Sequence, residues 1–359
     1  MRIVIFCHSL LSDWNHGNAH FLRGICSELI SRGHKVSVYE PENSWSYGNL
    51  VADNGEQFLA EFAAIYPNLS SIRYRLLELD EVLKDVQLAI VHEWNSPDLI
   101  AEIGSVRAKD SSFRLLFHDS HHRAVTQPHT IAKLDLSGYD GVLAYGSSLR
   151  DVHLRNGWVR RAWVWHEAAD TRVFRPVEDA KKEYDLAWIG NWGDDERTSE
   201  LYEFLIKPVR DLRLKAIVYG VRFPAFALKT LVEAGINYGG WLPNFRVPKV
   251  FERAKVTVHI PRRPYASALP GIPTIRPFEA LACGIPLVSA PWRDAEKLFR
   301  AGEDLLFAEN GAEMTRHLNA LLTRPRLASA LARNGLQTIR GNHTCRHRVE
   351  ELLKILDAL

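Results

Sequence analysis

The sequence predicts an α/β protein of two domains, each built on a mostly parallel sheet with helices on both faces. Apolar runs of strand length alternate with amphipathic helical stretches, which is the pattern of a parallel sheet. The chain has 359 residues, and at about 150 residues per domain this length favours two domains. Hydrophobic residues at 46% and charged residues at 25% are typical of a globular chain with ample core.

Charge and cysteine content exclude several classes of protein. A net charge of +2, with basic residues no more than paired, does not suit a nucleic-acid partner. No apolar stretch approaches the roughly 18 residues needed to cross a bilayer, so at most peripheral membrane contact is expected. The opening run RIVIFC is too short for a secretory signal. Four scattered cysteines without a Cys-Xaa-Xaa-Cys pair indicate thiols in a reducing compartment, and we expect a cytoplasmic protein.

The first half opens with a strand, a loop, a helix and a second strand, over residues 2–7, 8–18, 19–32 and 35–39. The loop contains Gly17 but no Gly-Xaa-Gly-Xaa-Xaa-Gly fingerprint, so a dinucleotide cofactor is not expected. His16, in the same loop, is equally compatible with a ligand contact and with no role. The alternation continues with strands at 88–92, 113–117, 141–144 and 162–165 and with helices that begin at 97 and 147.

The loop that follows the strand at 113–117 is rich in polar side chains. Ligands of parallel sheets bind beyond the carboxyl ends of the strands, which is where His118, Asp119, His121 and His122 fall. These groups could bind a metal, satisfy the loop backbone or form an active-site loop. One short loop seldom supplies a full metal shell, and we favour the active-site interpretation.

The second half repeats the alternation after a polar, charged linker at 166–185. Strands are expected at 185–189, 214–219, 236–241 and 255–260, a helix from 198 and another ending near 235, and closing helices at 312–322, 326–340 and 343–359.

The stretch LPGIPTIRPFEALACGIPLVSA, residues 269–290, combines a loop, a helix, a tight stop and a buried strand. Thr274 is a candidate to cap the helix with its hydroxyl. A helix entered from such a loop offers free backbone N–H groups to a phosphate. Glu279, about one turn inside, could accept hydrogen bonds from two sugar hydroxyls, although an ordinary helix–strand unit with a surface carboxylate would show the same pattern.

FEALACGIPLVS resembles the nucleotide-sugar signature of glycosyltransferases with the GT-B fold. The flanking segments NFRVPKVFERAKVTVHIPR and LFRAGEDLLFAENGAEM are similar to that superfamily, and most of all to the branch of spore-maturation-like glycosyltransferases. The resemblance implies two Rossmann-like domains whose parallel sheets face a central cleft. It implies an acceptor-side domain at 1–175, a nucleotide-sugar-binding domain at 176–341 and a helix at 342–359 that crosses back to the first domain. Asp170, Phe174 and Pro176 match a family motif at the boundary.

The resemblance also implies roles for individual residues. Glu279 would hold the ribose of a nucleotide diphosphate sugar, with UDP favoured, and Arg197 would contact the diphosphate. A surface ion pair with Asp194 or Asp195 is the simple alternative for Arg197. Gly190 would allow a close backbone approach. The donor-side candidates are Glu279, Arg197, Gly190, Asn191, Trp241, Leu242, Arg262, Arg263, Thr274, Ile275, Gly17 and His16.

Transfer to a hydroxyl requires removal of the acceptor proton and neutralisation of the departing diphosphate. Asp119 is the candidate base if the anomeric configuration inverts, with His118 or His121 positioning it; if configuration is retained, these residues would orient the sugar. Arg262 and Arg263 could neutralise the diphosphate without a metal. No Asp-Xaa-Asp occurs in the chain, so we expect metal-independent catalysis with the nucleotide sugar as the only small co-substrate.

Gly271 departs from the family pattern, because many retaining members carry a glutamate eight residues before the ribose-binding one. The stereochemical course is therefore open. The expected function is transfer of a sugar to an unknown hydroxyl of a glycan, lipid, metabolite or protein. A nucleotide-sugar epimerase of the same fold and a non-catalytic nucleotide-sugar-binding partner protein are the alternatives.

Overall fold

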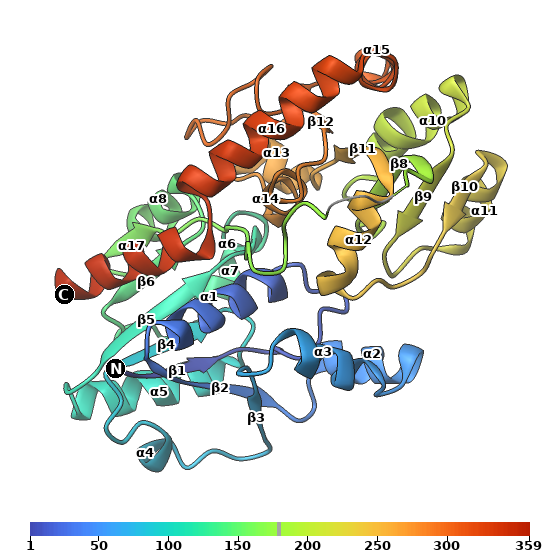
Figure 1. Ribbon diagram of the computed structural model, residues 1–359. Helices are drawn as coiled ribbons and strands as arrows, with labels where there is room; N and C mark the ends of the chain where they lie inside the picture. The colour runs from blue at the N-terminus through green and yellow to red at the C-terminus, as the bar shows by residue number, and fades with distance from the viewer. Residues whose placement is uncertain (178–180) are drawn as a thin grey trace. The chain divides into compact units, whose positions relative to one another are not determined.

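The computed structural model describes residues 1–177 and 181–359. It divides into two compact units, Met1–Glu167 with Cys345–Leu359, and Ala168–Thr344 (Figure 1). The first unit ends at Glu167, whereas the sequence placed the boundary near residue 175. The linker expected at 166–185 includes residues 178–180, which lie outside the described residues. The last helix is part of the first unit.

The first unit is built on a seven-stranded parallel sheet in the order β3-β2-β1-β4-β5-β6-β7. Its strands are β1 (Arg2–Phe6), β2 (Lys35–Pro41), β3 (Ser71–Tyr74), β4 (Leu88–His92), β5 (Arg114–Asp119), β6 (Gly141–Ala144) and β7 (Ala162–Val164). The chain runs outward from β1 to β3 and then returns to place β4 on the other side of β1. The strand order therefore reverses between β1 and β4, and a crevice for ligands is expected at this switch point.

Nine helices of the described residues accompany this sheet. They are α1 (Ala19–Ser31), α2 (Trp45–Asn54), α3 (Phe58–Ile65), α4 (Leu79–Val82), α5 (Pro97–Lys109), α6 (Arg123–Thr126), α7 (Pro128–Ile131), α8 (Ser147–Arg155) and α17 (Cys345–Asp357). Helix α17 lies along α1 (Figure 1). The Trp165 indole N–H donates to the Arg348 carbonyl at 2.8 Å, and the Arg348 guanidinium donates to the His166 carbonyl. These two bonds fix the last helix within the first unit.

The second unit has a six-stranded parallel sheet in the order β10-β9-β8-β11-β12-β13. Its strands are β8 (Tyr184–Ile189), β9 (Ala216–Tyr219), β10 (Ile236–Tyr238), β11 (Ala254–His259), β12 (Leu287–Ser289) and β13 (Leu306–Phe307). The chain again runs outward on one side and returns on the other, so this sheet has its own switch point between β8 and β11.

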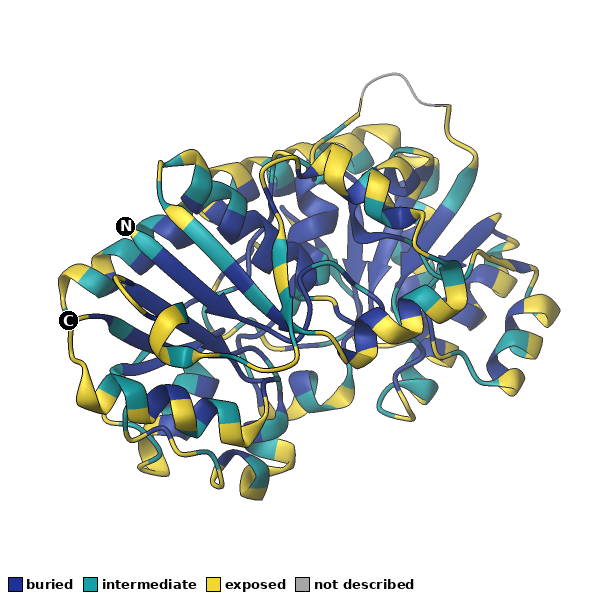
Figure 2. Ribbon diagram, turned by 90° about the horizontal axis from the view of Figure 1, so that it is seen from below, coloured by how far each residue is buried: buried dark blue, intermediate teal, exposed yellow. Residues whose placement is uncertain are grey.

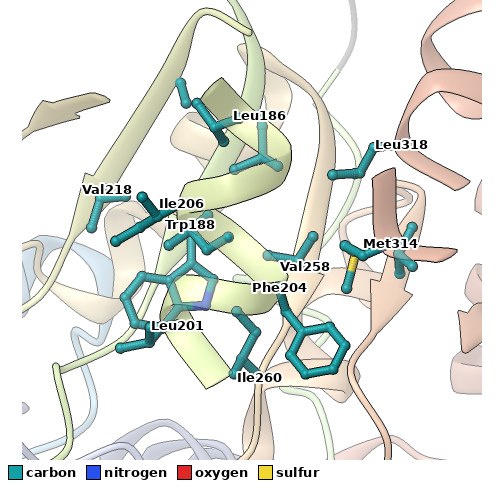
Figure 3. Close-up of a cluster of buried hydrophobic side chains, with 14 of the residues drawn as sticks. Leu186, Trp188, Leu201, Phe204, Ile206, Val218, Val258, Ile260, Met314 and Leu318 are labelled. Atoms are coloured by element: carbon teal, nitrogen blue, oxygen red, sulfur yellow. The ribbon is translucent and has the colours of Figure 1, made fainter. Parts of the chain in front are cut away.

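The helices of the second unit are α9 (Thr198–Leu201), the π-helical turn η1 (Tyr202–Ile206), α10 (Lys207–Leu212), α11 (Ala225–Glu233), the 3₁₀ turn η2 (Asn244–Arg246), α12 (Val247–Glu252), α13 (Arg263–Ala268), α14 (Ile275–Ala282), α15 (Gly311–Thr323) and α16 (Pro325–Asn342). One core cluster joins apolar side chains of η1 and α15 to those of the strands, with Trp188 and Phe204 among its largest members (Figure 3). Figure 2 shows the consequence: central strands are mostly buried, whereas edge strands such as β3 and β10 and the outer faces of helices are more exposed.

Most strands and helices that the apolar periodicity predicts are present, with ends that differ by one to three residues. Helices α2 and α3 and the edge strand β3 were not predicted. Their segments are polar, short or interrupted by glycine, and they are ordered by packing instead of by local pattern. Within the described residues, no helix combines the length and the apolar character needed to cross a membrane.

Candidate functional site

Polar side chains gather at the switch point of the second sheet, where β8 and β11 end. The register pairs Ala187 of β8 with Thr257 of β11, so the loops after both strands leave at the same edge. Arg197, from the loop after β8, reaches across: its guanidinium donates to the Asn191 carbonyl at 3.1 Å and to the Ile260 carbonyl at 2.8 Å. Within residues 1–177 and 181–359, carbonyl oxygens hold this cation in place of the ion pair with Asp194 or Asp195 that the sequence suggested; Asp194 pairs with Arg222.

Helix α14 carries Glu279 in a fully buried position. The Asn244 side-chain amide donates to Glu279 at 2.8 Å, and the Arg276 guanidinium forms a short ion pair with the same carboxylate. The carboxylate is thus held in one orientation before any ligand arrives. The expected cap is absent: Thr274 has a φ of 61°, and its side chain makes no capping hydrogen bond at this helix.

Arg197, Arg262 and Arg276 lie close enough to one another to interact electrostatically. Burial lowers the pKa of Arg197, and the positive charges of Arg262 and Arg276 lower it further. Arg262 is paired with Glu196 at 3.1 Å and Arg276 with Glu279. Three guanidiniums at the end of a parallel sheet form a strongly positive region, and their planar N–H groups suit a diphosphate.

His259 ends β11 beside these arginines. One ring nitrogen, Nδ1, lies 2.9 Å from the Ser289 hydroxyl, which also accepts the Trp292 indole N–H at 3.0 Å. The other, Nε2, is buried and has no hydrogen-bond partner within the described residues. Burial, reinforced by Arg197 and then Arg276, lowers the pKa of His259 to about 3, so the imidazole is neutral near pH 7.

The two arginines after β11 differ in position. Arg262 lies beside Arg197 and is mostly buried, whereas the Arg263 side chain is 52% exposed and pairs with Glu200 at 2.9 Å. Both were predicted to face the diphosphate. The structure places Arg262 beside Arg197 and Arg263 in a surface ion pair, and the roles of both at the diphosphate stay predictions.

Gly190 and Asn191 have structural roles that the sequence did not reveal. A Cβ at Gly190 would lie 2.8 Å from the Trp188 ring and 3.1 Å from the Arg197 guanidinium. The Asn191 side-chain oxygen accepts the Val221 backbone N–H at 2.9 Å. Both residues therefore shape the loop that presents Arg197.

Three further donor-side candidates lie around α14 and the strand end after β10. Trp241 and Leu242 are partly buried, and Leu242 packs against a core cluster of the unit. Ile275, the first residue of α14, is buried. Their roles in nucleotide binding stay predictions.

Gly271 lies in the loop that leads to α14. It has a φ of 93°, a conformation that side-chain-bearing residues rarely adopt, and a Cβ there would lie 2.8 Å from Cγ of Glu296 and 2.9 Å from its carboxylate. The Glu296 carboxylate, from the loop after β12, therefore lies next to the position where many retaining family members carry their own glutamate.

The loop after β5 in the first unit is held by buried charges. The Asp119 carboxylate is fully buried and lies 2.7 Å from Nε2 of His153, which is also fully buried. Its other oxygen accepts the His121 backbone N–H at 3.3 Å. Because both oxygens are engaged, this geometry favours a positioning role for Asp119, and its role as the base stays a prediction.

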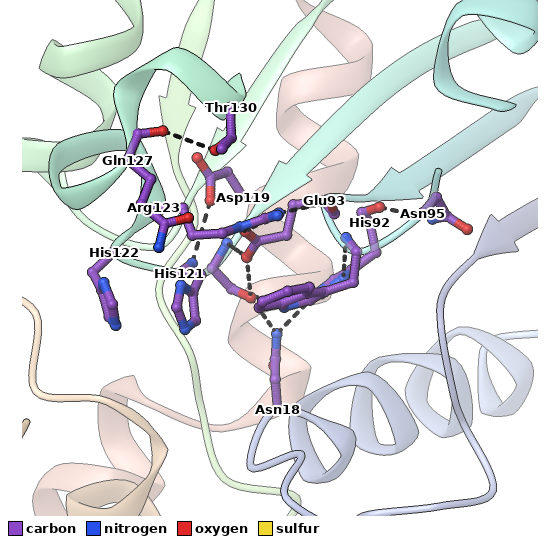
Figure 4. Close-up of polar contacts among 12 residues, drawn as sticks. Asn18, His92, Glu93, Asn95, Asp119, His121, His122, Arg123, Gln127 and Thr130 are labelled. Carbon is purple, nitrogen blue, oxygen red and sulfur yellow. Dashed lines mark hydrogen bonds and ion pairs between the residues drawn. The ribbon is translucent and has the colours of Figure 1, made fainter. Parts of the chain in front are cut away.

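Glu93, after β4, fixes the same loop from the other side (Figure 4). It accepts the Ser120 backbone N–H at 2.9 Å and pairs with Arg123 at 3.0 Å. Burial, together with the nearby Asp119 charge, raises the pKa of Glu93 to about 8, whereas Arg123 and the Ser120 N–H favour the charged carboxylate. The Arg123 guanidinium also lies 4.0 Å from the Trp94 ring centroid.

His118 and His121 separate in space. The His118 ring points into the unit, 5.0 Å from the Trp165 ring and 5.2 Å from that of His92, and burial lowers its pKa to about 4. His121 is half-buried and lies 5.1 Å from Trp94. His92 is 3.2 Å from the Ser120 hydroxyl and from the Asn18 amide, which joins the first loop to the loop after β5 (Figure 4).

His16 lies directly at the switch point of the first sheet, whereas Gly17 is exposed. The His16 ring is 4.0 Å from the ring of His8, which follows β1, and 6.2 Å from that of His92. The register explains the meeting: Phe6 of β1 pairs with Val91 of β4, so His8 and His92 leave adjacent strand ends. Within residues 1–177 and 181–359, no group of three or more His, Cys, Asp and Glu side chains is arranged to hold a metal ion.

Sequence reasoning missed several residues of both regions, namely His8, His92 and Glu93 in the first unit and Asn244, His259 and Arg276 in the second. Three of the six, His92, Glu93 and His259, lie at or directly after strand ends, and His8 lies two residues after one. A polar residue at the end of a buried apolar strand is therefore the sequence feature that could have identified these residues.

The chain resembles known proteins in sequence and in fold. Residues 197–354 match a family model described as glycosyl transferase-like. No curated protein sequence matches the chain. The fold is that of GT-B proteins: sucrose-phosphate synthase from Thermosynechococcus elongatus superposes with a TM-score of 0.68 at 13% identity, covering 100% of this chain and 99% of that one.

Two other solved structures are similar over their whole length. HepE of Anabaena in complex with UDP and glucose has a TM-score of 0.69 and 13% identity, with 100% of both chains covered. An alpha-glucosyltransferase in complex with UDP has a TM-score of 0.72 and 13% identity, covering 99% of this chain and 100% of that one. At these identities the likeness concerns the fold.

Proposed function

We propose that the protein is a glycosyltransferase of the GT-B fold that transfers a sugar from a UDP-sugar to an acceptor hydroxyl without a metal ion. The observation that carries the proposal is the buried Glu279, fixed by Asn244 and Arg276 beside a group of three guanidiniums. A carboxylate held in this way can accept hydrogen bonds from two ribose hydroxyls, and the guanidiniums can hold the diphosphate.

The arginines also supply what the chemistry needs. Transfer adds one negative charge to the departing diphosphate, and positive groups fixed in place stabilise that charge in the transition state. Arg197 is held by two carbonyl oxygens and therefore keeps its charge unneutralised by a carboxylate bond, whereas Arg262 and Arg276 each share theirs with a glutamate. We propose that Arg197 provides the largest part of this stabilisation and that no metal is required.

UDP is the proposed nucleotide because HepE and the alpha-glucosyltransferase, both similar in fold, have been solved with UDP. The acceptor is proposed to bind at the first unit. A cytoplasmic location is proposed from the four cysteines, which are free thiols in the structure. Burial raises the pKa of Cys7 and Cys283 well above the usual range, which keeps these thiols protonated and unreactive.

The test is a calorimetric and thermal-shift panel of UDP, dTDP, GDP and ADP against wild type, Glu279→Gln and the exposed control Glu309→Gln. A nucleotide at about 100 times its dissociation constant should stabilise the fold by about 2.7 kcal/mol. We expect UDP to bind wild type and the control and to bind Glu279→Gln at least about tenfold more weakly. Equal affinity of UDP for all three proteins, or no binding of any nucleotide, would contradict the donor-site proposal.

A further inference from the structure

We infer that the acceptor is an uncharged saccharide, bound at the switch point of the first sheet with its hydroxyls on His8 and His16 and its ring against Trp45. The inference rests on the proposed function and names its acceptor class. Three observations carry it: ring nitrogens without partners, a loop that is held rigidly, and the absence of an unpaired cation among the described residues of this region.

The two imidazoles are buried, yet three of their four ring nitrogens lack a hydrogen-bond partner within the described residues. Neither Nδ1 nor Nε2 of His8 has a partner within the described residues, and the same is true of Nε2 of His16. The side chains are only 4% and 7% exposed. Buried polar groups are nearly always paired, and each unpaired one reduces stability, so three such atoms in adjacent rings point to an external partner.

The loop that carries both histidines is fixed by buried charges. The Glu40 carboxylate, on β2, accepts the backbone N–H groups of Leu10 and Leu11. Arg23, on α1, donates to the carbonyls of the same two residues and pairs with Asp13 at 2.8 Å. The loop is therefore held in place before a ligand binds, and the unpaired nitrogens are not the result of a loose segment.

Further hydrogen bonds tie the loop to helix α2, which begins with Trp45. The Ser46 hydroxyl donates to the Trp14 carbonyl at 2.8 Å, and the Trp14 indole donates to Asp53 at 2.8 Å. The Trp45 ring is nearly parallel to that of His8, at an interplanar angle of 6° and a centroid distance of 5.9 Å. Trp45 is nevertheless 43% exposed, which leaves part of a rigid aromatic ring available to a ligand.

The electrostatics of this region suit a neutral ligand that both donates and accepts hydrogen bonds. Burial lowers the pKa of His8 to about 4 and that of His16 well below its usual value, so both rings are neutral near pH 7. A neutral imidazole has one donor and one acceptor nitrogen, which matches a sugar hydroxyl. The nearby cations are neutralised: Arg23 pairs with Asp13, and Arg123 pairs with Glu93.

A sugar adds an apolar face to its hydroxyls, and aromatic rings bind such faces through their large apolar area. Trp45 offers that area beside the histidines. A phosphorylated or carboxylated acceptor would instead require an unneutralised cation, and both nearby arginines are paired with carboxylates. The observations therefore favour a neutral saccharide over an anionic acceptor.

The experiment is saturation-transfer NMR on the full chain with UDP present. The probes are methyl α-glucoside, methyl β-galactoside and methyl α-mannoside, with glucose 6-phosphate as the anionic probe. The proteins are wild type, Trp45→Ala, His8→Phe and the control Phe226→Ala, which removes an exposed aromatic ring of similar accessibility, at 49%, from the second unit. The uracil proton signals of UDP report donor binding in the same samples.

We expect at least one glycoside to bind wild type in preference to glucose 6-phosphate. Trp45→Ala and His8→Phe should each weaken it by about tenfold, and Phe226→Ala should not. His8→Phe should melt at or above the wild-type temperature, because it removes two buried nitrogens that have no partner. A merely structural histidine would lower the melting temperature when replaced.

Three results would overturn the inference: no glycoside bound while UDP is bound, preference for glucose 6-phosphate, or glycoside affinity unchanged in both variants. Since UDP binding is observed independently, loss of the acceptor inference is distinguishable from failure of the donor proposal. Trp45 is largely exposed on its helix, so Trp45→Ala keeps the test decisive even if His8→Phe does not fold.

Discussion

The two sheets of this protein share a strand order across their switch points, although the first has one strand more, and they have opposite chemistry there. Between β1 and β4, the loop ends carry the neutral, buried imidazoles of His8, His16 and His92. Between β8 and β11, they carry Arg197 together with a neutral His259. In both cases strand order alone brings the residues together, because the chain reverses direction across the first strand of each sheet.

The difference indicates how one architecture serves two substrates. Fixed guanidiniums beside a buried carboxylate suit a ribose and a diphosphate, whereas neutral rings beside an indole suit hydroxyls. Among the described residues of the first region, Arg23 is paired with Asp13 and Arg123 with Glu93. The comparison therefore predicts that changes in the first unit alter acceptor binding without altering nucleotide binding, and the reverse.

The largest expected effect concerns Asp119. An unpaired carboxylate there would make the first region acidic and would contradict its description as neutral. Asp119→Ala removes one partner of a fully buried pair, and we expect unfolding free energy to fall by about 3–5 kcal/mol in urea denaturation. The double variant Asp119→Ala/His153→Leu should recover part of this loss. Wild-type stability together with complete loss of transfer activity would instead identify Asp119 as the base.

The next largest effect is the pH dependence of stability, which tests whether His8 is neutral in the folded protein. Unfolded His8 takes up a proton near pH 6.5, but the folded protein does so only near pH 4. The unfolded state therefore binds more protons between these values, and stability falls as the pH is lowered from 6.5 to 4. Wild type should lose about 3 kcal/mol more than His8→Phe across this range.

The comparison of wild type with His8→Phe isolates one group, because the other buried histidines are present in both proteins. Glu93, whose pKa is raised to about 8, acts in the opposite direction: its contribution falls as the pH rises from about 4.5 to 8, equally in both. Urea denaturation at pH 7, 6 and 5 gives the measurement. Identical pH profiles would mean that His8 is not held neutral.

A smaller effect is expected at Gly271, in the loop that leads to the donor helix. Gly271→Ala introduces a side chain at a φ of 93° and within 2.8 Å of Glu296, and we expect a loss of about 2 kcal/mol. Glu296→Ala in the same background should relieve the steric part of that loss. A Gly271→Ala protein as stable as wild type would contradict this account of the loop.

The smallest effect compares the two arginines after β11. Arg262→Met removes a cation next to Arg197 and should weaken UDP binding by about tenfold. Arg263→Met breaks a surface ion pair with Glu200, which contributes little, and should leave UDP affinity unchanged. Calorimetry of UDP binding to both variants checks the contrast. An equal loss of UDP affinity in the two variants would mean that both arginines contact the diphosphate.

Local pattern accounts for much of the fold. The strands at β1, β4 and β6 and the helix at α14 follow from apolar runs and their periodicity, which short-range physics determines. Helix α2 was missed because NSWSYGNLVADNG is polar and contains two glycines; hydrogen bonds of Ser46 and Trp14 to a distant loop accompany it. Tertiary packing overrides propensity there.

The site was less predictable for the same reason. Glu279 and Arg197 were found through resemblance, but Arg276 and Asn244, which hold Glu279, carried no pattern of their own. Whether His8 lies beside His92 depends on strand order, which periodicity does not reveal. The engagement of Asp119 by His153 likewise joins residues 34 positions apart in the sequence.

The most direct test of the opposite chemistry is the UDP affinity of wild type, Arg197→Met and His8→Phe, measured by calorimetry at low and high salt. Binding to fixed cations is weakened by salt. We predict that Arg197→Met binds UDP about a hundredfold more weakly than wild type and with less salt dependence, whereas His8→Phe matches wild type at both salt concentrations. A folded His8→Phe protein that fails to bind UDP, or an Arg197→Met protein that binds it normally, would contradict the account.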